Sequence, residues 1–309
     1  MNIVQIGFAK SGNFFLYSIL KGILTEAGMW KETFIQRHSR YAEVKDLDLS
    51  YSGQADIDAM EITEEGTFFK VSSCFRDPIP DLSRYIETSP LVWTHSKYCS
   101  KTGEVLKHFD KVVYICRDVR DVIISSAHFS MTPYYLKYFP LSTYTYGSTT
   151  EFFDKNLETL AKRWAIHISG YLTLNNTYWI FYEKLLADFE SEFNKLLEYL
   201  NIVLSPQSKE KIKAAVSFNN MKKDYPLHVR QGKQQGWVDT LDDEQNECLI
   251  RKAGDVLSLL GYPLHRDEIF DPMKLKGPRG MSNFNFLRKL FKRVKRALIS
   301  ESLGYSKKN

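Results

Sequence analysis

The chain lacks the features that mark disulfide-bonded, metal-binding and membrane-spanning proteins. Its 309 residues include only four cysteines, which lie far apart and form no C-x-x-C pair. This spacing indicates free thiols in a reducing compartment and offers no metal-ligand pattern. No window of about 18 apolar residues occurs, so we predict no membrane-spanning helix. The first residues show neither the basic segment nor the apolar run of a secretory signal, which predicts a cytoplasmic protein.

A net positive charge is found only in the last part of the chain. Residues 274–309 hold eleven Lys or Arg and one acidic residue, a local charge of +10 within a total of +5. The preceding residues therefore carry about −5. A slightly acidic body argues against a broad nucleic-acid-binding surface, so we expect no nucleic-acid partner.

Strand-like and helix-like segments alternate along most of the chain. Apolar runs predict strands at 3–8, 67–71, 90–94, 111–116 and 177–182, and apolar residues at helical spacing predict helices at 14–27, 157–174, 185–200 and 244–260. Such alternation predicts one α/β domain, residues 1–272, with a central parallel sheet flanked by helices. A basic C-terminal extension, residues 273–309, follows it.

Two segments show little periodicity. Residues 128–150 are rich in Tyr, Phe, Ser and Thr. We interpret them as a long aromatic loop or lid, or alternatively as a surface excursion with its own small hydrophobic cluster. Residues 221–240 are polar and contain glycines, and we predict a second loop there.

The segment IGFAKSGNFFLYSIL, residues 6–20, has the pattern of a phosphate-binding loop. A turn between a strand and a helix points backbone N–H groups at one place, and the helix N-terminus adds partial positive charge. Gly12 permits a close backbone approach, Ser11 and Asn13 add side-chain donors, and Lys10 adds a full charge. The alternative is an ordinary strand-to-helix turn with a surface lysine.

The same loop differs from the G-x-x-x-x-G-K-[ST] pattern of ATPases and GTPases. Its lysine precedes the Ser-Gly pair, and no Lys-Ser or Lys-Thr pair follows the second glycine. The helix start therefore offers no evident magnesium ligand, which weakens the case for a P-loop nucleotide kinase.

The segment KVVYICRDVRDVIISSAHF, residues 111–129, repeats this arrangement. Arg117 follows a buried strand and so lies at the crevice of an open α/β sheet. Ser125 lies eight residues later, about two helical turns. An arginine fork and a hydroxyl at this spacing suit one phosphate group. Alternatively, Arg117 pairs at the surface with Asp118 or Asp121.

Together these segments resemble the sulfotransferases that use 3′-phosphoadenosine 5′-phosphosulfate (PAPS). FAKSGNFF resembles the family's 5′-phosphosulfate loop, and CRDVRDVIISSAHF resembles its 3′-phosphate block. Residues 179–202 and 229–247 resemble two further family segments, in the same order, so that the resemblance spans roughly residues 3–262. It implies transfer of a sulfuryl group from PAPS to a hydroxyl or amine of an acceptor, without a metal.

The resemblance also implies roles for individual residues. Lys10, His95 and Ser125 would form the catalytic set, with His95 as the general base and Lys10 facing the leaving phosphate. The implied contacts of the 5′-phosphate are Lys10, Ser11, Gly12, Asn13 and Phe14; those of the adenine region are Phe15, Tyr182, Ser217 and Phe218; those of the 3′-phosphate are Arg117, Ser125, Arg230, Gln231 and Gly232.

His95 fits the base role on chemical grounds as well, because histidine accepts a proton near neutral pH. It follows a short apolar run in PLVWTHSKY. Two departures from the family accompany it: Trp93 and Gln231 stand where the family has lysines. The reduced positive charge predicts weaker PAPS binding or an unusual acceptor, and leaves open a related nucleotide-binding or membrane-binding protein without catalysis.

The acceptor and the tail remain the least constrained. Residues 30–60 and 128–146 would line the acceptor site by resemblance, and their apolar content suits a small molecule, a glycan or a lipid with an apolar part. Residues 283–300 combine an apolar helical face with basic residues. This pattern predicts contact with an anionic membrane at its cytoplasmic face; the alternatives are a helix docked on the body or a basic tail paired with the acidic body.

Overall fold

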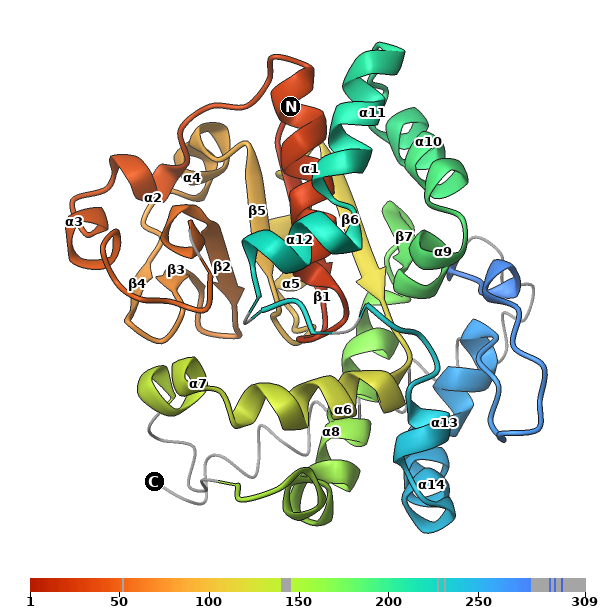
Figure 1. Cartoon of the computed structure of the whole chain (residues 1–309). Coiled ribbons are helices and arrows are strands. Elements are labelled where there is room, and N and C mark those ends of the chain that lie inside the picture. Colours follow the sequence, from red (N-terminus) through yellow and green to blue (C-terminus); the bar gives the residue numbers. More distant parts are fainter. Residues whose placement is uncertain are drawn as a thin grey trace.

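The computed structural model describes residues 1–278 apart from 52, 140–145, 227 and 231, together with 289, 292 and 296 (Figure 1). Gln231 and nearly all of the helix expected over 283–300 therefore lie outside the described part. Within that part, none of the helices is both long enough and apolar enough to cross a bilayer.

A seven-stranded sheet in the order β4-β3-β2-β5-β1-β6-β7 forms the centre of the molecule. Its strands are β1 (Ile3–Gly7), β2 (Asp58–Ile62), β3 (Thr67–Val71), β4 (Phe75–Pro78), β5 (Leu91–Thr94), β6 (Lys111–Cys116) and β7 (Thr177–Phe181). The five strands from β2 to β7 in this order are parallel to their neighbours, whereas β3 and β4 add an antiparallel edge. The predicted α/β domain with a central, mainly parallel sheet is confirmed.

Helices flank this sheet (Figure 1). They are α1 (Asn13–Glu26), α2 (Phe34–Arg37), α3 (Tyr41–Val44), η1 (Gln54–Asp56), α4 (Leu82–Thr88), α5 (Thr102–Leu106), α6 (Val119–Ser130), α7 (Pro133–Tyr138), α8 (Thr149–Tyr171), α9 (Tyr182–Ala187), α10 (Phe189–Leu200), α11 (Pro206–Ala215), α12 (Phe218–Asp224), α13 (Trp237–Thr240), α14 (Asp243–Leu260) and η2 (Pro272–Lys274). Of the four predicted helical segments, 14–27, 157–174 and 244–260 each fall mainly within a single helix, whereas 185–200 is divided between α9 and α10.

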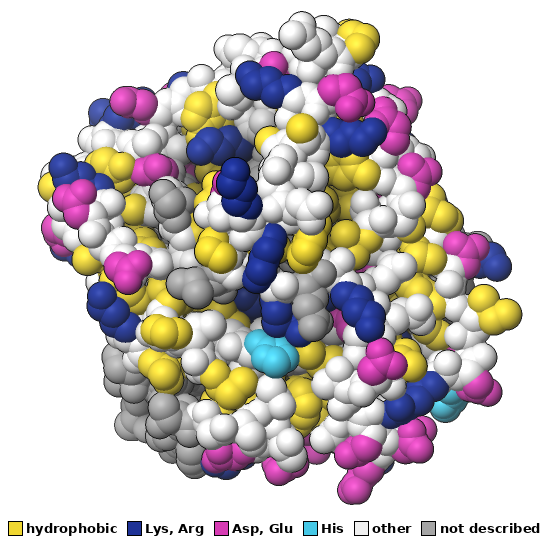
Figure 2. Space-filling view, in the orientation of Figure 1, with side chains coloured by type: hydrophobic (Ala, Val, Ile, Leu, Met, Phe, Trp, Pro, Cys, Tyr) yellow, Lys and Arg dark blue, Asp and Glu magenta, His cyan; other side chains and the backbone are white. Residues whose placement is uncertain are grey.

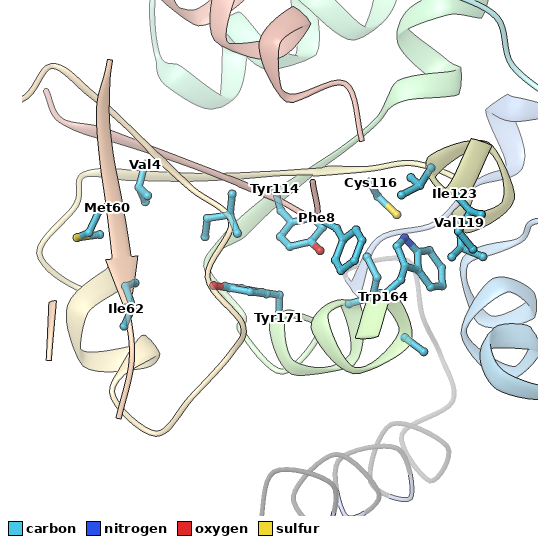
Figure 3. Close-up of a cluster of buried hydrophobic side chains, with 14 of the residues drawn as sticks. Val4, Phe8, Met60, Ile62, Tyr114, Cys116, Val119, Ile123, Trp164 and Tyr171 are labelled. Carbon is cyan, nitrogen blue, oxygen red and sulfur yellow. The ribbon is translucent and has the colours of Figure 1, made fainter. Parts of the chain in front are cut away.

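Two hydrophobic clusters, one on each face of the sheet, hold the layers together. Side chains alternate between the faces of a strand, so β6 contributes to both. Val113 and Ile115 belong to the cluster with α1, whereas Tyr114 and Cys116 belong to the cluster with α6 and α8. In Figure 3, Cys116 lies beside Trp164 of α8, and Phe8 lies between Tyr114 and Trp164. This double burial fixes the parallel strands, whose carboxyl ends carry the site.

The strand predictions hold where the apolar runs are continuous. β1, β3, β5, β6 and β7 lie within one residue of their predicted bounds. β2 and β4 were not predicted. β2 reads DAMEI, with only alternate residues fully buried, and the edge strand β4 reads FRDP, with a single buried residue. Neither is apolar enough to stand out from the neighbouring polar residues.

Three segments differ from their predicted form. The helix predicted over 185–200 is broken at Asp188, whose side chain accepts a hydrogen bond from Ser191 N and so caps α10. The predicted loop over 128–150 contains the end of α6, all of α7 and the start of α8; Thr132 caps α7, and Pro133 occupies its first turn. The predicted loop over 221–240 is irregular only between α12 and α13. Short capping signals thus override weak periodicity.

Candidate active site

The loop between β1 and α1 forms one wall of the site. Gly12 has φ 89° and ψ 21°, and no side chain caps the N-terminus of α1 at this position. A Cβ atom on Gly12 would lie 2.4 Å from Cδ2 of Tyr182. The first N–H groups of a helix lack partners within it and carry partial positive charge. Only glycine therefore allows this open helix end to form against the Tyr182 ring, and the result suits an anion.

The side chains of Ser11 and Asn13 behave differently. Asn13 Nδ2 donates to Phe8 O at 2.8 Å, and Gln5 Nε2 donates to Asn13 O at 2.7 Å. The Asn13 amide therefore braces the loop, and a contact of this residue with an anion would come through its backbone N–H. By contrast, the Ser11 hydroxyl is buried and makes no hydrogen bond within the described part of the chain.

Lys10 extends from the same loop toward α6. Its φ of 68° is unusual for a residue with a Cβ. Lys10 Nζ lies 4.0 Å from the centre of the Phe129 ring, an arrangement that attracts a cation. Burial first, and then the positive charges of Arg117 and Arg230, lower the pKa of Lys10 to about 8. The ammonium group is therefore mainly protonated at neutral pH, and any anion that joins it is further stabilised by the two arginines.

Arg117 follows β6 and links three parts of the site. Its Nη1 donates to Lys10 O at 3.4 Å, and its Nη2 donates to Lys233 O at 3.0 Å. The guanidinium carbon lies 4.4 Å from the centre of the Tyr182 ring. The buried Arg117 Nε has no hydrogen-bond partner in the described region. Arg117 thus holds two loops together and keeps one donor for a ligand.

The alternative placed Arg117 at the surface, which is wrong because Arg117 is buried, but its pairing with Asp121 is present as an ion pair. Its Nη2 lies 3.9 Å from Asp121 Oδ2, a distance too long for a hydrogen bond. Asp118 instead pairs with Arg120, whose Nη2 lies 2.6 Å from Asp118 Oδ2. Asp118 N also donates to Glu183 Oε1 at 2.9 Å. This buried network fixes the start of α6 directly beneath Arg117.

The segment after α11 closes over the Arg117 side of the site. Ser217 caps α12 by accepting from Asn220 N at 3.4 Å, so its hydroxyl serves the helix. Gly232 has φ 58°, and a Cβ there would lie 2.5 Å from Cδ2 of Phe218. The predicted base-flanking residue Phe218 and the predicted phosphate-binding residue Gly232 therefore touch each other. Arg230 acts electrostatically on both Lys10 and Arg117.

His95 directly follows β5. In the sheet, β5 and β6 lie on opposite sides of β1, so His95 and Arg117 lie on opposite sides of the loop that carries Lys10. The Nδ1 of His95 lies 2.6 Å from Gly7 O, and its Nε2 lies 3.0 Å from Trp93 Nε1. The side chain of His95 is exposed, and the desolvation that it still experiences beside the loop, together with the positive charges of Lys70 and Lys10, lowers its pKa to about 4. A neutral imidazole is the form that accepts a proton.

A cavity of about 680 Å³ joins these elements. Its lining includes most of the expected site residues, namely Lys10, Gly12, Asn13, Phe14, Phe15, His95, Arg117, Ser125, Tyr182, Phe218, Arg230 and Gly232. Ser11 and Ser217 do not line it, and Gln231 lies outside the described residues. Ser125 reaches it from the half-buried face of α6. Figure 2 shows Lys and Arg side chains gathered near the middle of the face on which Figure 1 places α12.

The His95 end of the cavity is mainly aromatic. Tyr51, Trp93, Phe129, Tyr134 and Phe152 line it, which draws on both segments expected to surround the acceptor. Lys70 and Arg163 also contribute, whereas no Asp or Glu stands among the described lining residues. Desolvated carboxylates would favour a cationic ligand, so this lining favours a neutral or anionic one.

Several contacts of the site could not be read from sequence. His228 Nδ1 lies 3.0 Å from Ser50 Oγ, and the His228 ring packs at 4.8 Å on Phe14, which ties the cofactor-side loop to the opposite wall. Lys70 also lines the cavity, but nothing in the sequence of β3 marks it as a site residue. Neither residue belongs to a motif; only the apolar residues around Ser50 and the predicted loop at 221–240 hinted at these regions.

Comparison with known proteins identifies the family. The pattern of the sulfotransferase domain matches residues 2–257. The chain belongs to the sulfotransferase domain family. Cytosolic sulfotransferase 1 of Danio rerio is 26% identical over 227 residues, which cover 65% of this chain and 73% of that protein. A flavonol sulfotransferase-like protein of Flaveria bidentis is 24% identical over 237 residues, which cover 65% of this chain and 74% of the relative.

Solved structures share the fold of this sulfotransferase. The mouse sulfotransferase SULT7A1 was crystallised with PAP (3′-phosphoadenosine 5′-phosphate). It has a TM-score of 0.52 at 16% identity, and the match covers 83% of each chain. Retinol dehydratase, crystallised with androsterone and the inactive cofactor PAP, has a TM-score of 0.52 at 18% identity, covering 88% of this chain and 82% of the other. The predicted sulfotransferase fold is thus confirmed both from sequence and from structure.

Proposed function

We propose that this sulfotransferase transfers a sulfuryl group from PAPS to a hydroxyl group of a small, largely apolar acceptor. One observation supports the proposal above all: a single cavity brings together the open N-terminus of α1, Lys10, Arg117 and His95. The two structural neighbours were crystallised with 3′-phosphoadenosine 5′-phosphate (PAP), the nucleotide that PAPS leaves behind. Donor groups for two phosphates and a proton acceptor are the parts that this reaction needs.

The nucleotide end of the cavity fits two separate phosphate groups. The open end of α1 and Lys10 suit the 5′-phosphate, and the unpartnered Arg117 Nε, with Ser125 and Arg230, suits the 3′-phosphate. Phe15 and Phe218 offer flat apolar surfaces for the adenine between them. The buried Ser11 hydroxyl provides a further donor beneath the loop, provided that the loop shifts to expose it.

The proposed reaction moves one proton and exchanges one bond. His95 Nε2 accepts the hydroxyl proton while the acceptor oxygen forms its bond to sulfur. The bond between sulfur and the bridging oxygen of the 5′-phosphate breaks, and Lys10 faces the negative charge that this phosphate gains. The products are a sulfate ester, PAP and one proton, which passes from His95 to solvent. Positioning and electrostatics do most of the catalytic work, as in phosphoryl transfer.

The lining of the cavity narrows the acceptor class. Protonated amines are disfavoured, because Lys10, Lys70 and Arg163 face the cavity and the described lining holds no carboxylate. The aromatic walls favour an acceptor with a planar or extended apolar body. We therefore propose phenols or apolar alcohols as the acceptors. A glycan, whose surface is largely polar, fits the aromatic walls less well than a small apolar molecule or a lipid.

A second candidate is a sulfotransferase-like protein that binds the nucleotide without catalysis. The hydrogen bond from Trp93 to His95 Nε2 favours it, because this bond occupies the nitrogen that the reaction requires. Binding of PAP without turnover of PAPS on any acceptor would support this candidate over the first.

We further propose a cytoplasmic location, which the Danio rerio relative named cytosolic supports. The basic sequence at 283–300 would attach the chain to anionic membranes at their cytoplasmic face. We also propose that the α/β domain ends at residue 272 and that the basic extension begins at residue 273. The sharpest test compares the full chain with one ending at 278 on vesicles of neutral lipid and on vesicles that also contain anionic phosphatidylserine, as the cytoplasmic leaflet does. Equal binding of the two chains would remove the membrane proposal.

The function itself is tested with sulfur-labelled PAPS and a panel of phenols, apolar alcohols and amines. We expect label in the sulfate esters of phenols or alcohols, and little on amines. His95→Ala and Lys10→Ala should each lose at least about 100-fold in kcat, typical of removing a base or a charge-stabilising group. Lys45→Ala, at an exposed lysine that does not line the cavity, is the matched control. Rates like those of the unmodified protein in either variant would refute the assigned roles.

A further inference from the structure

The two nitrogen atoms of His95 have distinct partners. Nδ1 lies 2.6 Å from Gly7 O, and a carbonyl oxygen can only accept a hydrogen bond. Nδ1 must therefore carry the proton of the neutral imidazole, which leaves Nε2 as the proton acceptor. The backbone of β1 thus selects the tautomer of a side chain that follows β5.

The proton-accepting nitrogen is not open. Trp93 Nε1 lies 3.0 Å from His95 Nε2, and an indole N–H can only donate. The two rings meet edge-on, with centroids 5.4 Å apart and an interplanar angle of 80°. The indole N–H therefore donates a hydrogen bond to His95 Nε2.

The position of Trp93 is set by the sheet. Trp93 and His95 are two residues apart at the end of β5, and such residues lie on the same face of a strand. On its other side, the Trp93 ring packs against Tyr17 of α1, with centroids 5.6 Å apart. Trp93 also lines the cavity. An acceptor that enters the cavity therefore meets the indole and the imidazole together.

We propose that Trp93 is a positioning residue that covers the proton-accepting nitrogen of His95 until an acceptor hydroxyl displaces its indole N–H. The inference rests on the proposed sulfuryl transfer and deepens it. An acceptor must offer Nε2 a better donor than the indole, and a phenol O–H does so because it is the more acidic donor. Acceptors that do not reach Nε2 leave the base covered, so Trp93 also selects among bound molecules.

The hydrogen bond from Trp93 can be measured through the titration of His95, because the charges around His95 do not change when Trp93 is replaced. The positive charges of Lys10 from the first loop and Lys70 from β3 act on His95, and His95 in turn acts on the buried His167 of α8. All three remain when Trp93 is changed. Donation to Nε2 stabilises the neutral ring, so its loss raises the affinity of Nε2 for a proton. A change in the pKa of His95 in Trp93→Phe then measures the effect of losing the hydrogen bond from the indole N–H.

The test uses the full-length protein with 15N-labelled histidine and tryptophan. In the free protein, we expect the tautomer of His95 that is protonated at Nδ1. Adding PAP alone should leave the Trp93 indole signal unchanged, and adding PAP with saturating phenol should shift it toward the value of an unbonded indole. An Nε2-protonated tautomer, or an indole signal that saturating phenol leaves in place, overturns the proposal without requiring any variant to fold.

Two variants complete the experiment. In Trp93→Phe, which keeps a ring against Tyr17, His95 should titrate at higher pH, and kcat/KM for phenol should rise about 3- to 10-fold, the worth of one neutral hydrogen bond. Trp179→Phe is the control, because it removes from β7 a buried indole N–H that has no hydrogen-bond partner in the described part of the chain and lies outside the cavity lining. An unchanged His95 titration in Trp93→Phe overturns the proposal. Absence of turnover in every protein, with the spectroscopic results as expected, would count against sulfuryl transfer and not against the hydrogen bond.

Discussion

Gly12 and Tyr182 fit together so closely that no other residue fits at position 12: a Cβ there would lie 2.4 Å from Cδ2 of the Tyr182 ring. This contact couples the first loop to β7 and α9, which are more than 160 residues away in sequence. Tyr182 in turn carries the guanidinium of Arg117 on its face, 4.4 Å from the ring centre. The two proposed phosphate sites are therefore built on one shared tyrosine.

Gly12→Ala should damage the nucleotide site far more than the fold. The left-handed backbone at φ 89° costs a non-glycine residue about 1–2 kcal/mol, and the clash with Tyr182 displaces the ring beneath Arg117. We expect PAP affinity to fall at least about 10-fold, measured by calorimetry. Gly103→Ala is the matched control, since a Cβ there meets nothing within 4 Å. Equal PAP affinity in both variants would show that the loop does not hold the nucleotide.

Arg117→Lys should weaken PAP binding although it keeps the charge. The lysine loses the fork that contacts Lys10 O and Lys233 O, and it loses the unpartnered Nε. We expect a loss of about 10- to 100-fold in affinity for PAP and a much smaller loss for ADP, which lacks the 3′-phosphate. Arg84→Lys, at an exposed position on α4, provides the control. Parallel losses for PAP and ADP would assign Arg117 to the wrong phosphate.

PAP affinity should depend on pH through Lys10. Burial and the neighbouring arginines lower the pKa of Lys10 to about 8, so the ammonium charge is present below pH 8 and is lost above it. Affinity should therefore fall as the pH rises through 8, with the midpoint moved upward in the complex because the bound anion favours the protonated form. Calorimetry from about pH 6.5 to about pH 9.5, roughly 1.5 units on each side of that pKa, measures the change in PAP affinity. Lys10→Ala should bind weakly with a flat profile; a profile parallel to that of the unmodified protein would exclude Lys10 as the titrating group.

The rate of sulfuryl transfer should rise with pH through a much lower value. Desolvation and the charges of Lys70 and Lys10 lower the pKa of His95 to about 4, so the base is already neutral at pH 5 and above. We expect kcat/KM to increase through about pH 4 and to show no further increase near pH 6.5, the usual value for histidine. His95→Gln should lose about 100- to 10,000-fold. His108→Gln, at an exposed position, should keep the full rate. A rise centred near pH 6.5 that persists in His95→Gln would show that another group serves as the base; one that His95→Gln removes would show that the pKa of His95 is not lowered.

Glu183 should make the fold less stable at high pH. Burial raises the pKa of its carboxyl to about 7, above the value of the unfolded chain. The folded state therefore holds the proton more tightly, and stability is lost as the pH rises through the window from about 4.5 to 7. Asp58 and Asp121, each raised by burial to a pKa of about 6, act in the same direction. Glu183→Gln, which keeps an acceptor for Asp118 N, should flatten the decline.

Urea denaturation at pH 5 and at pH 8 measures this difference. The loss between the two pH values should be smaller in Glu183→Gln by on the order of 3 kcal/mol at most, since one pKa unit corresponds to about 1.4 kcal/mol. Glu198→Gln, at an exposed position on α10, should leave the decline unchanged. If Glu183→Gln loses as much stability as the unmodified protein, the carboxyl of Glu183 is already ionised in the fold at pH 5.

The sequence was informative where a residue's role depends on its immediate neighbours. The continuous apolar run of β6 predicted a buried strand. Because Arg117 directly follows this strand, its side chain was predicted to lie at the carboxyl end of the sheet. Gly12 and Lys10 stood out because a turn between strand and helix has few solutions. In contrast, β2 and β4 are partly polar, so their pairing with neighbouring strands, not their own pattern, makes them strands: β4 pairs antiparallel with β3, and β2 pairs antiparallel with β3 and parallel with β5.

The contacts that decide the chemistry could not be predicted in the same way. The bond between Trp93 and His95 depends on the rotation of two side chains that share a strand face, and sequence spacing leaves that rotation open. Asn13 read as a ligand donor, yet its amide is bonded to Phe8 O under the loop. Phe129 under Lys10, and Ser50 beside His228, come from segments that only the folded sheet brings together.

Calorimetric titration with PAP, ADP and ATP tests the central claim most directly, because it needs no knowledge of the acceptor. The site is built for separate phosphates at the open end of α1 and at Arg117. We therefore predict that PAP binds at least about 10-fold more tightly than ADP, a difference in line with one charged, bidentate phosphate contact, and also more tightly than ATP. No heat with PAP, or tighter binding of ATP than of PAP, would contradict the assignment of this cavity to PAPS.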